Sequence, residues 1–121
     1  MTWYDIKLIT LQKMFAVSGD RIVRDDVTLP YLAAMPYVCN EGLALLYTDE
    51  RVSPIMFDEY EFRLDEKGAM LLPLYMASQL YKDEDAGLAA IYRNEFEVGR
   101  EQFLRSGKSN VGAAKVVRLR G

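Results

Sequence analysis

The densest group of chemically active side chains is the acidic run Asp83-Glu84-Asp85, which follows Lys82. Carboxylate oxygens are the ligands that Ca²⁺ and Mg²⁺ prefer, so a cation site is one interpretation. The run lacks the glycine turn and the distal glutamate of a calcium-binding loop. Aspartate is also favoured at helix N-caps, where it complements the helix dipole. The sequence therefore favours a solvated turn in which Asp83 or Asp85 caps the next helix, and it predicts no metal site.

Cys39 is the only cysteine, and the chain contains no histidine. A catalytic cysteine needs a nearby base and a basic environment, and histidine is the residue that most often supplies the base. Cys39 instead falls with Met35 and Leu43 on one stripe of a predicted helix, which indicates a small core residue. A lone cysteine cannot form an internal disulfide, so a reducing compartment is expected.

Glu95 and Glu97 are the remaining candidates for acid–base chemistry. Residues two apart point to different faces of a helix, so this pair cannot act on one substrate. We therefore predict no catalytic residue, no cofactor and no enzymatic activity.

Aromatic and basic side chains alternate near Tyr92 and Arg93, a pattern that also occurs in stacking platforms for nucleic acids. Core packing is the competing interpretation, because most of these aromatic residues fall on apolar helix stripes. Aromatic residues and arginine are also enriched at subunit interfaces. We expect such an interface to involve Tyr81, Tyr92, Arg93 and Phe96.

The N-terminal segment predicts a helix of about four turns that Thr2 caps, with Asp5 completing a capping box. Lys7 is expected to face water, and Gly19 to end the helix in the left-handed conformation. The expected apolar stripe consists of Tyr4, Leu8, Leu11 and Phe15, and it is widened by Ile6, Ile9 and Met14.

A second helix is expected from Thr28 as its cap, with Pro30 in its first turn. Pro36 lies inside the apolar pattern and predicts either a kink or a break; the residue before a proline resists helical geometry, which favours the break. The expected buried stripe consists of Leu32, Met35, Cys39, Leu43 and Leu46.

Residues 48–67 are the least helical part of the sequence. Tyr60, Phe62 and Leu64 alternate with charged residues, which is the period-two pattern of a half-buried strand. A short strand or extended segment is therefore expected here.

Two amphipathic helices are then predicted to fold back on each other through the acidic turn. The first carries an apolar stripe at Met70, Leu74, Ala77 and Tyr81. The second carries one at Leu88, Tyr92, Phe96, Gly99 and Phe103. Gly99 on the second stripe predicts the close approach of another helix. Ser106-Gly107 is expected to end the second helix.

This helical pair resembles the C-terminal helices of head–tail connector (adaptor) proteins of tailed phages and prophages. The resemblance is carried by LPLYMASQLYKDEDAGLAAIYRNEFEVGREQF, residues 72–103, and by YLAAMPYVCNEGLALL, residues 31–46. With the N-terminal helix it covers most of residues 1–105. It implies a head-completion protein that forms a twelvefold ring beneath the portal protein and contacts the tail or the next neck protein. DNA would pass through the channel without sequence-specific binding.

The charge is distributed unevenly. Residues 106–121 contain four basic residues and no acidic one, which leaves 11 basic and 18 acidic residues in residues 1–105, a net charge of −7. An acidic body argues against nucleic-acid binding by the helical part. The resemblance suggests that the C-terminal segment Lys115, Val116, Val117, Arg118, Leu119 and Arg120 adds a strand to the portal. Two other interpretations stay open, a tail without a role and weak binding to DNA.

The prediction for the whole chain is a mainly α protein. Residues 1–105 are expected to form one connector-like four-helix bundle with a short extended segment between its second and third helices, and residues 106–121 an extended basic tail. No run of about 18 apolar residues occurs, so no membrane span is expected. The expected location is the head–tail junction of a virion, reached from the cytoplasm of a bacterial host. A small helical regulatory or nucleic-acid-binding protein of a prophage is the alternative.

Overall fold

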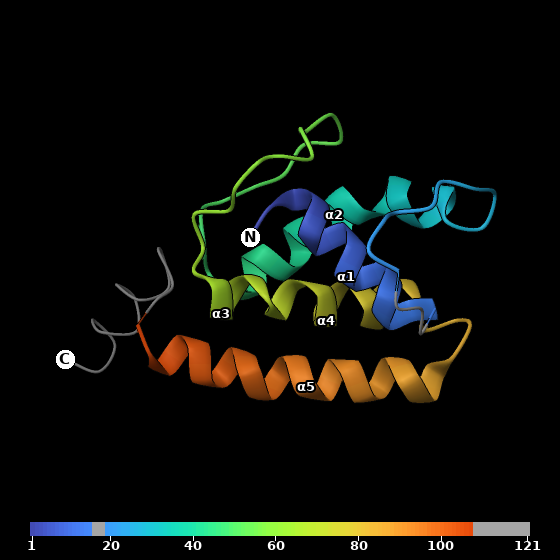
Figure 1. Ribbon diagram of the computed structural model, residues 1–121. Coiled ribbons are helices and arrows are strands. Elements are labelled where there is room, and N and C mark those ends of the chain that lie inside the picture. The colour runs from blue at the N-terminus through green and yellow to red at the C-terminus, as the bar shows by residue number, and fades with distance from the viewer. Residues whose placement is uncertain (16–18, 108–121) are drawn as a thin grey trace.

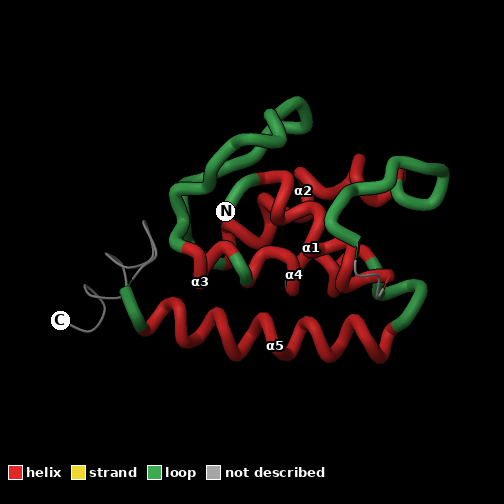
Figure 2. Tube along the Cα trace, in the orientation of Figure 1, coloured by secondary structure: helices red, strands yellow, loops and turns green. Residues whose placement is uncertain are grey.

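The computed structural model describes residues 1–15 and 19–107 (Figure 1). The described residues contain the helices α1 (Trp3–Phe15), α2 (Leu29–Leu45), α3 (Glu66–Ala69), α4 (Leu71–Leu80) and α5 (Ala86–Arg105). Helix α3 is a single turn, and Figure 2 shows loops but no strand between the helices in this part of the chain. The prediction of a mainly α fold is confirmed.

Helix α4 lies at the centre of the fold. It packs against α5 on one side and against α1 and α2 on the other (Figure 1). Its predicted single stripe is wrong, because Met70 is 39% exposed while residues around the helix are buried. The buried set consists of Leu71, Leu72, Pro73, Tyr75, Met76, Ala77 and Ser78. A helix with neighbours on both sides needs apolar residues all round, which a one-face pattern does not describe.

Helix α1 begins as predicted. The Thr2 hydroxyl oxygen accepts a hydrogen bond from the Asp5 backbone N–H (3.1 Å), and the Asp5 carboxylate accepts one from the Thr2 N–H (3.0 Å). The buried apolar residues are Trp3, Ile6, Leu11 and Met14, so the predicted stripe is confirmed at Ile6, Leu11 and Met14, and Trp3 is added to it. Its other predicted members are only half-buried. Lys7 is buried rather than facing water. Its Nζ lies 2.6 Å from Asp58 and over the Trp3 ring, which compensates for its burial.

Helix α2 runs continuously through Pro36, so the favoured break is wrong. The predicted buried stripe is confirmed, and it continues on both sides of the proline. Each buried apolar side chain contributes roughly 1.5–3 kcal/mol. Their sum exceeds the roughly 3 kcal/mol that an internal proline costs. Thr28 makes no side-chain cap; its hydroxyl donates instead to the Val23 carbonyl.

Helix α5 follows the prediction most closely. Asp85 Oδ1 accepts a hydrogen bond from the Leu88 N–H (3.0 Å), which confirms the capping turn. Phe96 and Phe103 are buried on the predicted stripe. The helix ends at Arg105, and Gly107 follows with a φ of 74°; among the described glycines it alone has a positive φ, so the left-handed position predicted at Gly19 is not found.

We call residues 48–64 the arm. They leave α2, extend away from the helices and return to α3 (Figures 1 and 2). The predicted burial pattern is confirmed, with Phe62 and Leu64 buried between exposed charged residues. The predicted strand is wrong, because its only pairing in the described chain is an isolated antiparallel bridge between Thr2 and Glu61.

Candidate interaction surfaces

The arm is fixed to the helices by the side chain of Asn40 on α2. Its Nδ2 donates to the Val52 carbonyl (2.9 Å), and its Oδ1 accepts from the Val52 N–H (2.8 Å). These two bonds reproduce the pairing that a neighbouring strand would give to one residue. The first half of the arm is therefore tied to α2 although it forms no regular structure.

The second half of the arm is held by the buried carboxylate of Glu50. It accepts hydrogen bonds from the backbone N–H groups of Arg63 (2.8 Å) and Leu64 (3.2 Å) and from the Tyr60 hydroxyl. The pKa of Tyr60 is raised, first by burial and then by this bond to Glu50. Because a side chain takes the backbone donors that a ladder would use, a period-two sequence here forms no strand.

Backbone bonds to the start of α1 complete the attachment. The Trp3 and Tyr4 N–H groups donate to the carbonyls of Tyr60 and Asp58, both at 2.9 Å. Together with the Lys7–Asp58 ion pair, these contacts fix the base of the arm on α1 as well as on α2.

The tip of the arm exposes large apolar side chains. Ile55 is 88% and Phe57 79% exposed, the largest values among the large apolar residues described. Single exposed apolar residues are common on protein surfaces. Two neighbouring ones on a loop that is held in place form a small apolar patch. We call Ile55 and Phe57 the tip.

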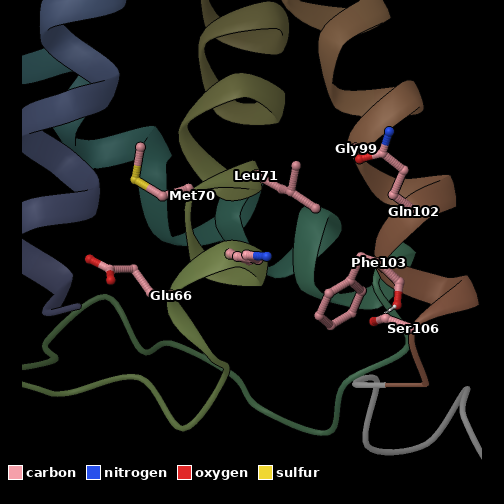
Figure 3. A pocket seen from close by; sticks show the side chains of 8 residues that line it. Glu66, Met70, Leu71, Gly99, Gln102, Phe103 and Ser106 are labelled. Atoms are coloured by element: carbon pink, nitrogen blue, oxygen red, sulfur yellow. Dashed lines mark hydrogen bonds between the residues drawn. The ribbon is translucent and has the colours of Figure 1, made fainter.

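A pocket of about 540 Å³ lies where α3 and the start of α4 meet the end of α5 (Figure 3). Glu66 and Met70 line it on one side, and Gln102, Phe103 and Ser106 line it on the α5 side. Leu71 and Gly99 form its inner wall, where a side chain at Gly99 would overlap Leu71 Cδ2. We call this cavity the end pocket.

The four residues predicted for a subunit interface lie close to one another in the chain but differ in exposure. Phe96 has no exposed surface and packs on Tyr75, with ring centroids 5.1 Å apart. It therefore belongs to the core of the single chain. Tyr81, Tyr92 and Arg93 are half-buried and keep part of their surface accessible.

The half-buried members make contacts within the chain. Tyr81 meets Phe15 edge to face, and the Tyr92 hydroxyl donates to the Lys13 carbonyl at 2.8 Å. Arg93 lies over the Tyr75 ring and donates to Glu97 at 2.9 Å. These contacts agree with core packing and leave no free stacking platform around Tyr92.

The candidates for chemistry are placed as packing and capping residues. Cys39 is fully buried; burial first and the Glu50 carboxylate second raise the pKa of its thiol far above its ordinary value. Glu95 is exposed, whereas Glu97 pairs with Arg93, so the two carboxylates do not converge. Residues 1–15 and 19–107 contain no cluster of three or more acidic or cysteine side chains arranged to hold a metal ion.

The predicted partner-binding segment Lys115 to Arg120 lies outside the described residues. Within the part of the chain that is described, no helix is long and apolar enough to cross a membrane.

Sequence reasoning missed the tip, the end pocket and the two side chains that hold the arm. The tip had a local signal, since Ile55-Met56-Phe57 is an apolar run directly after the Ser53-Pro54 turn. Asn40 and Glu50 had no such signal. The partner of Asn40 is 12 residues away and those of Glu50 are 10–14 residues away, and only the fold brings them together. Comparison of the chain with protein-family models, curated proteins and solved structures gives no match.

Proposed function

We propose that this protein is a structural subunit of a tailed phage or prophage virion, a head–tail connector. In this proposal it forms a ring, twelvefold as in the family it resembles, beneath the portal protein. The ring contacts the tail or the next neck protein on its other side, and DNA passes through it without sequence-specific binding.

The observation that carries the proposal is where the resembling segments lie. Residues 72–103 make up nearly all of α4 and α5, and residues 31–46 cover most of α2. Helix α4 packs against both α2 and α5. The resemblance thus falls on helices that share one core and not on scattered surface segments, which supports a relationship between whole folds.

The charge of the chain supports the same function. A net charge of −7 over residues 1–105 repels DNA, which suits a channel wall that DNA must cross without binding. The alternative, a regulatory nucleic-acid-binding protein, needs a helix with a basic face. In α2 the only charged residue is Glu41, and in α5 Arg93 and Arg105 are paired with glutamates on the same helix.

The proposal assigns a role to the basic C-terminal segment. Lys115 to Arg120 would add a strand to the edge of a sheet in the portal protein and anchor the ring. Tyr81, Tyr92 and Arg93 keep enough exposed surface to take part in contacts between subunits.

The test is co-assembly with a portal protein from the genome that encodes this chain. Purified chain and portal are mixed and separated by size, with the chain truncated after Arg105 as the comparison. Co-migration of the full chain and loss of co-migration for the truncated chain would support the proposal. A full chain that ignores the portal and shifts duplex DNA in a gel at moderate salt would favour the regulatory alternative.

A further inference from the structure

We infer that the tip of one copy inserts into the end pocket of a second copy and forms a head-to-tail contact between subunits. The inference deepens the proposed ring and rests on that proposal. It names the ring's contact surfaces, which neither the resemblance nor the ring symmetry specifies.

The tip has the properties of an interface anchor. Ile55 and Phe57 are largely exposed, so burial of both against a partner would be favourable. The arm that carries them is attached through Asn40, Glu50 and the start of α1. Side chains carried by a loop that is already fixed in this way lose little conformational entropy when they bind a partner.

The end pocket has the matching shape and polarity. It offers about 540 Å³, which is within the range of pockets that bind a small organic group. Its apolar surface comes from Met70, Leu71 and Phe103, and Leu71 packs directly against the backbone of Gly99, where there is no room for a Cβ atom. The 39% exposure of Met70 in the single chain leaves an apolar side chain at the pocket for a partner to cover.

The charges beside the two sites are complementary. Glu59 lies beside the tip, Lys67 lines the end pocket, and neither has an ion-pair partner in the described residues. Glu66 also lines the pocket and offsets part of the lysine charge. Lys67 of one copy can therefore pair with Glu59 of the next.

The positions of the tip and the end pocket determine how copies of the chain associate. The arm extends away from α5, whereas the end pocket lies between α3 and the C-terminal end of α5 (Figures 1 and 3). Two different surfaces that complement each other form a heterologous contact, and repetition of such a contact gives a closed ring or an open filament. This is the kind of interface that a cyclic connector needs.

Disulfide trapping tests the contact directly. The variants are Phe57→Cys and Gln102→Cys, each in the full chain, where the native Cys39 is buried. Equal amounts are mixed under conditions in which the wild-type chain assembles, with portal protein added if required, and oxidised. We expect a covalent dimer in the mixture and in neither variant alone. A mixture of Ile91→Cys with Gln102→Cys is the matched control, since Ile91 is exposed on the outer side of α5.

A second experiment introduces negatively charged side chains at the tip and, as a control, at an exposed apolar residue of α5. Ile55→Glu combined with Phe57→Glu should raise the protein concentration required for assembly about tenfold or more, because two anchors are lost. Ile91→Glu should leave it unchanged. Circular dichroism checks that all variants keep the helical content of the wild type.

The outcomes separate the two claims. Rings that form without the Phe57–Gln102 cross-link and tolerate the glutamates would overturn the contact and leave the connector proposal standing. The cross-link without any binding to portal would support the contact and count against the connector. A disulfide from Gln102→Cys to Val117→Cys in place of the tip would assign the pocket to the C-terminal segment and overturn the inference. Absence of self-association under every condition would overturn it as well.

Discussion

Asn40 and Val52 form two hydrogen bonds that join α2 to the arm, one in each direction between the amide side chain and the backbone. Asn40 is the only residue of α2 for which a side-chain hydrogen bond to the arm's backbone is described. The orientation of the tip therefore depends on this residue.

Asn40→Ala should destabilise the protein by about 1–3 kcal/mol, because it removes both bonds and leaves two polar groups of Val52 without their partner. Amide hydrogens in residues 50–64 should exchange faster with solvent, while those of α4 and α5 keep the protection set by global unfolding. Urea denaturation and hydrogen exchange measure the two effects. Asn94→Ala is the control, since Asn94 is exposed on α5. Equal stability of the two variants would contradict the assigned role of Asn40.

Glu50→Gln should cost about 2 kcal/mol although the two side chains have almost the same shape. The carboxylate accepts three hydrogen bonds, and a glutamine would turn an NH₂ group toward at least one of those donors. Urea denaturation measures the loss. Glu95→Gln, at an exposed position of α5, should change stability by less than about 0.5 kcal/mol. A Glu50→Gln variant as stable as this control would show that the arm does not require the charge.

Two glycines of α5 should respond in opposite directions to the same substitution. Gly87→Ala meets open space apart from an ordinary contact with Asp85, so it should stabilise the protein by up to about 1 kcal/mol. Gly99→Ala would overlap Leu71 and should be less stable than Gly87→Ala by about 1–3 kcal/mol. Thermal unfolding of both variants measures the difference. Equal stabilisation by both would mean that α4 and α5 do not approach each other at Gly99.

Stability should fall in alkaline solution through Tyr75. Burial and, second, the bond from its hydroxyl to Glu41 Oε1 (3.0 Å) raise the pKa of Tyr75 to about 12 from the ordinary value of 10. The unfolded chain therefore loses this proton first. The stabilisation is complete below pH 10 and decreases as the pH rises toward 12, by up to about 1.4 kcal/mol per pH unit.

Unfolding by urea at pH 8–11.5 tests this dependence. Tyr75→Phe should give a flatter curve than the wild type above pH 10, although burial also raises the pKa values of Tyr60 and Tyr92, so some decline remains. Tyr37→Phe is the control for the substitution, because Tyr37 is 62% exposed. Parallel curves for the wild type and Tyr75→Phe would contradict the assignment.

Buried residues were predicted best for a helix that packs against the rest of the protein with only one face. Helix α5 has a single buried face, so its period gave Phe96 and Phe103 correctly, and Asp85 carried its own capping signal. The same reasoning failed for α4, which has neighbours on both sides. Lys7 was predicted to be exposed because it is charged. Its ion-pair partner Asp58 is 51 residues away in the sequence, so no local pattern indicates that Lys7 can be buried.

The arm shows why the candidate site was harder to predict than the helices. Period-two alternation gave the burial of Phe62 and Leu64, but a strand also needs a neighbour, and Glu50 takes the backbone donors instead. The end pocket is formed by residues that are up to 40 positions apart, from Glu66 to Ser106. No local pattern encodes a cavity of that kind.

The mass and symmetry of the assembled particle test the central proposal most directly. Light scattering and negative-stain imaging would be applied to the chain with and without a portal protein from the same genome. The proposal predicts a closed ring on the portal with the portal's own symmetry, which is lost when residues 106–121 are deleted. A particle that stays monomeric and does not bind the portal would contradict it.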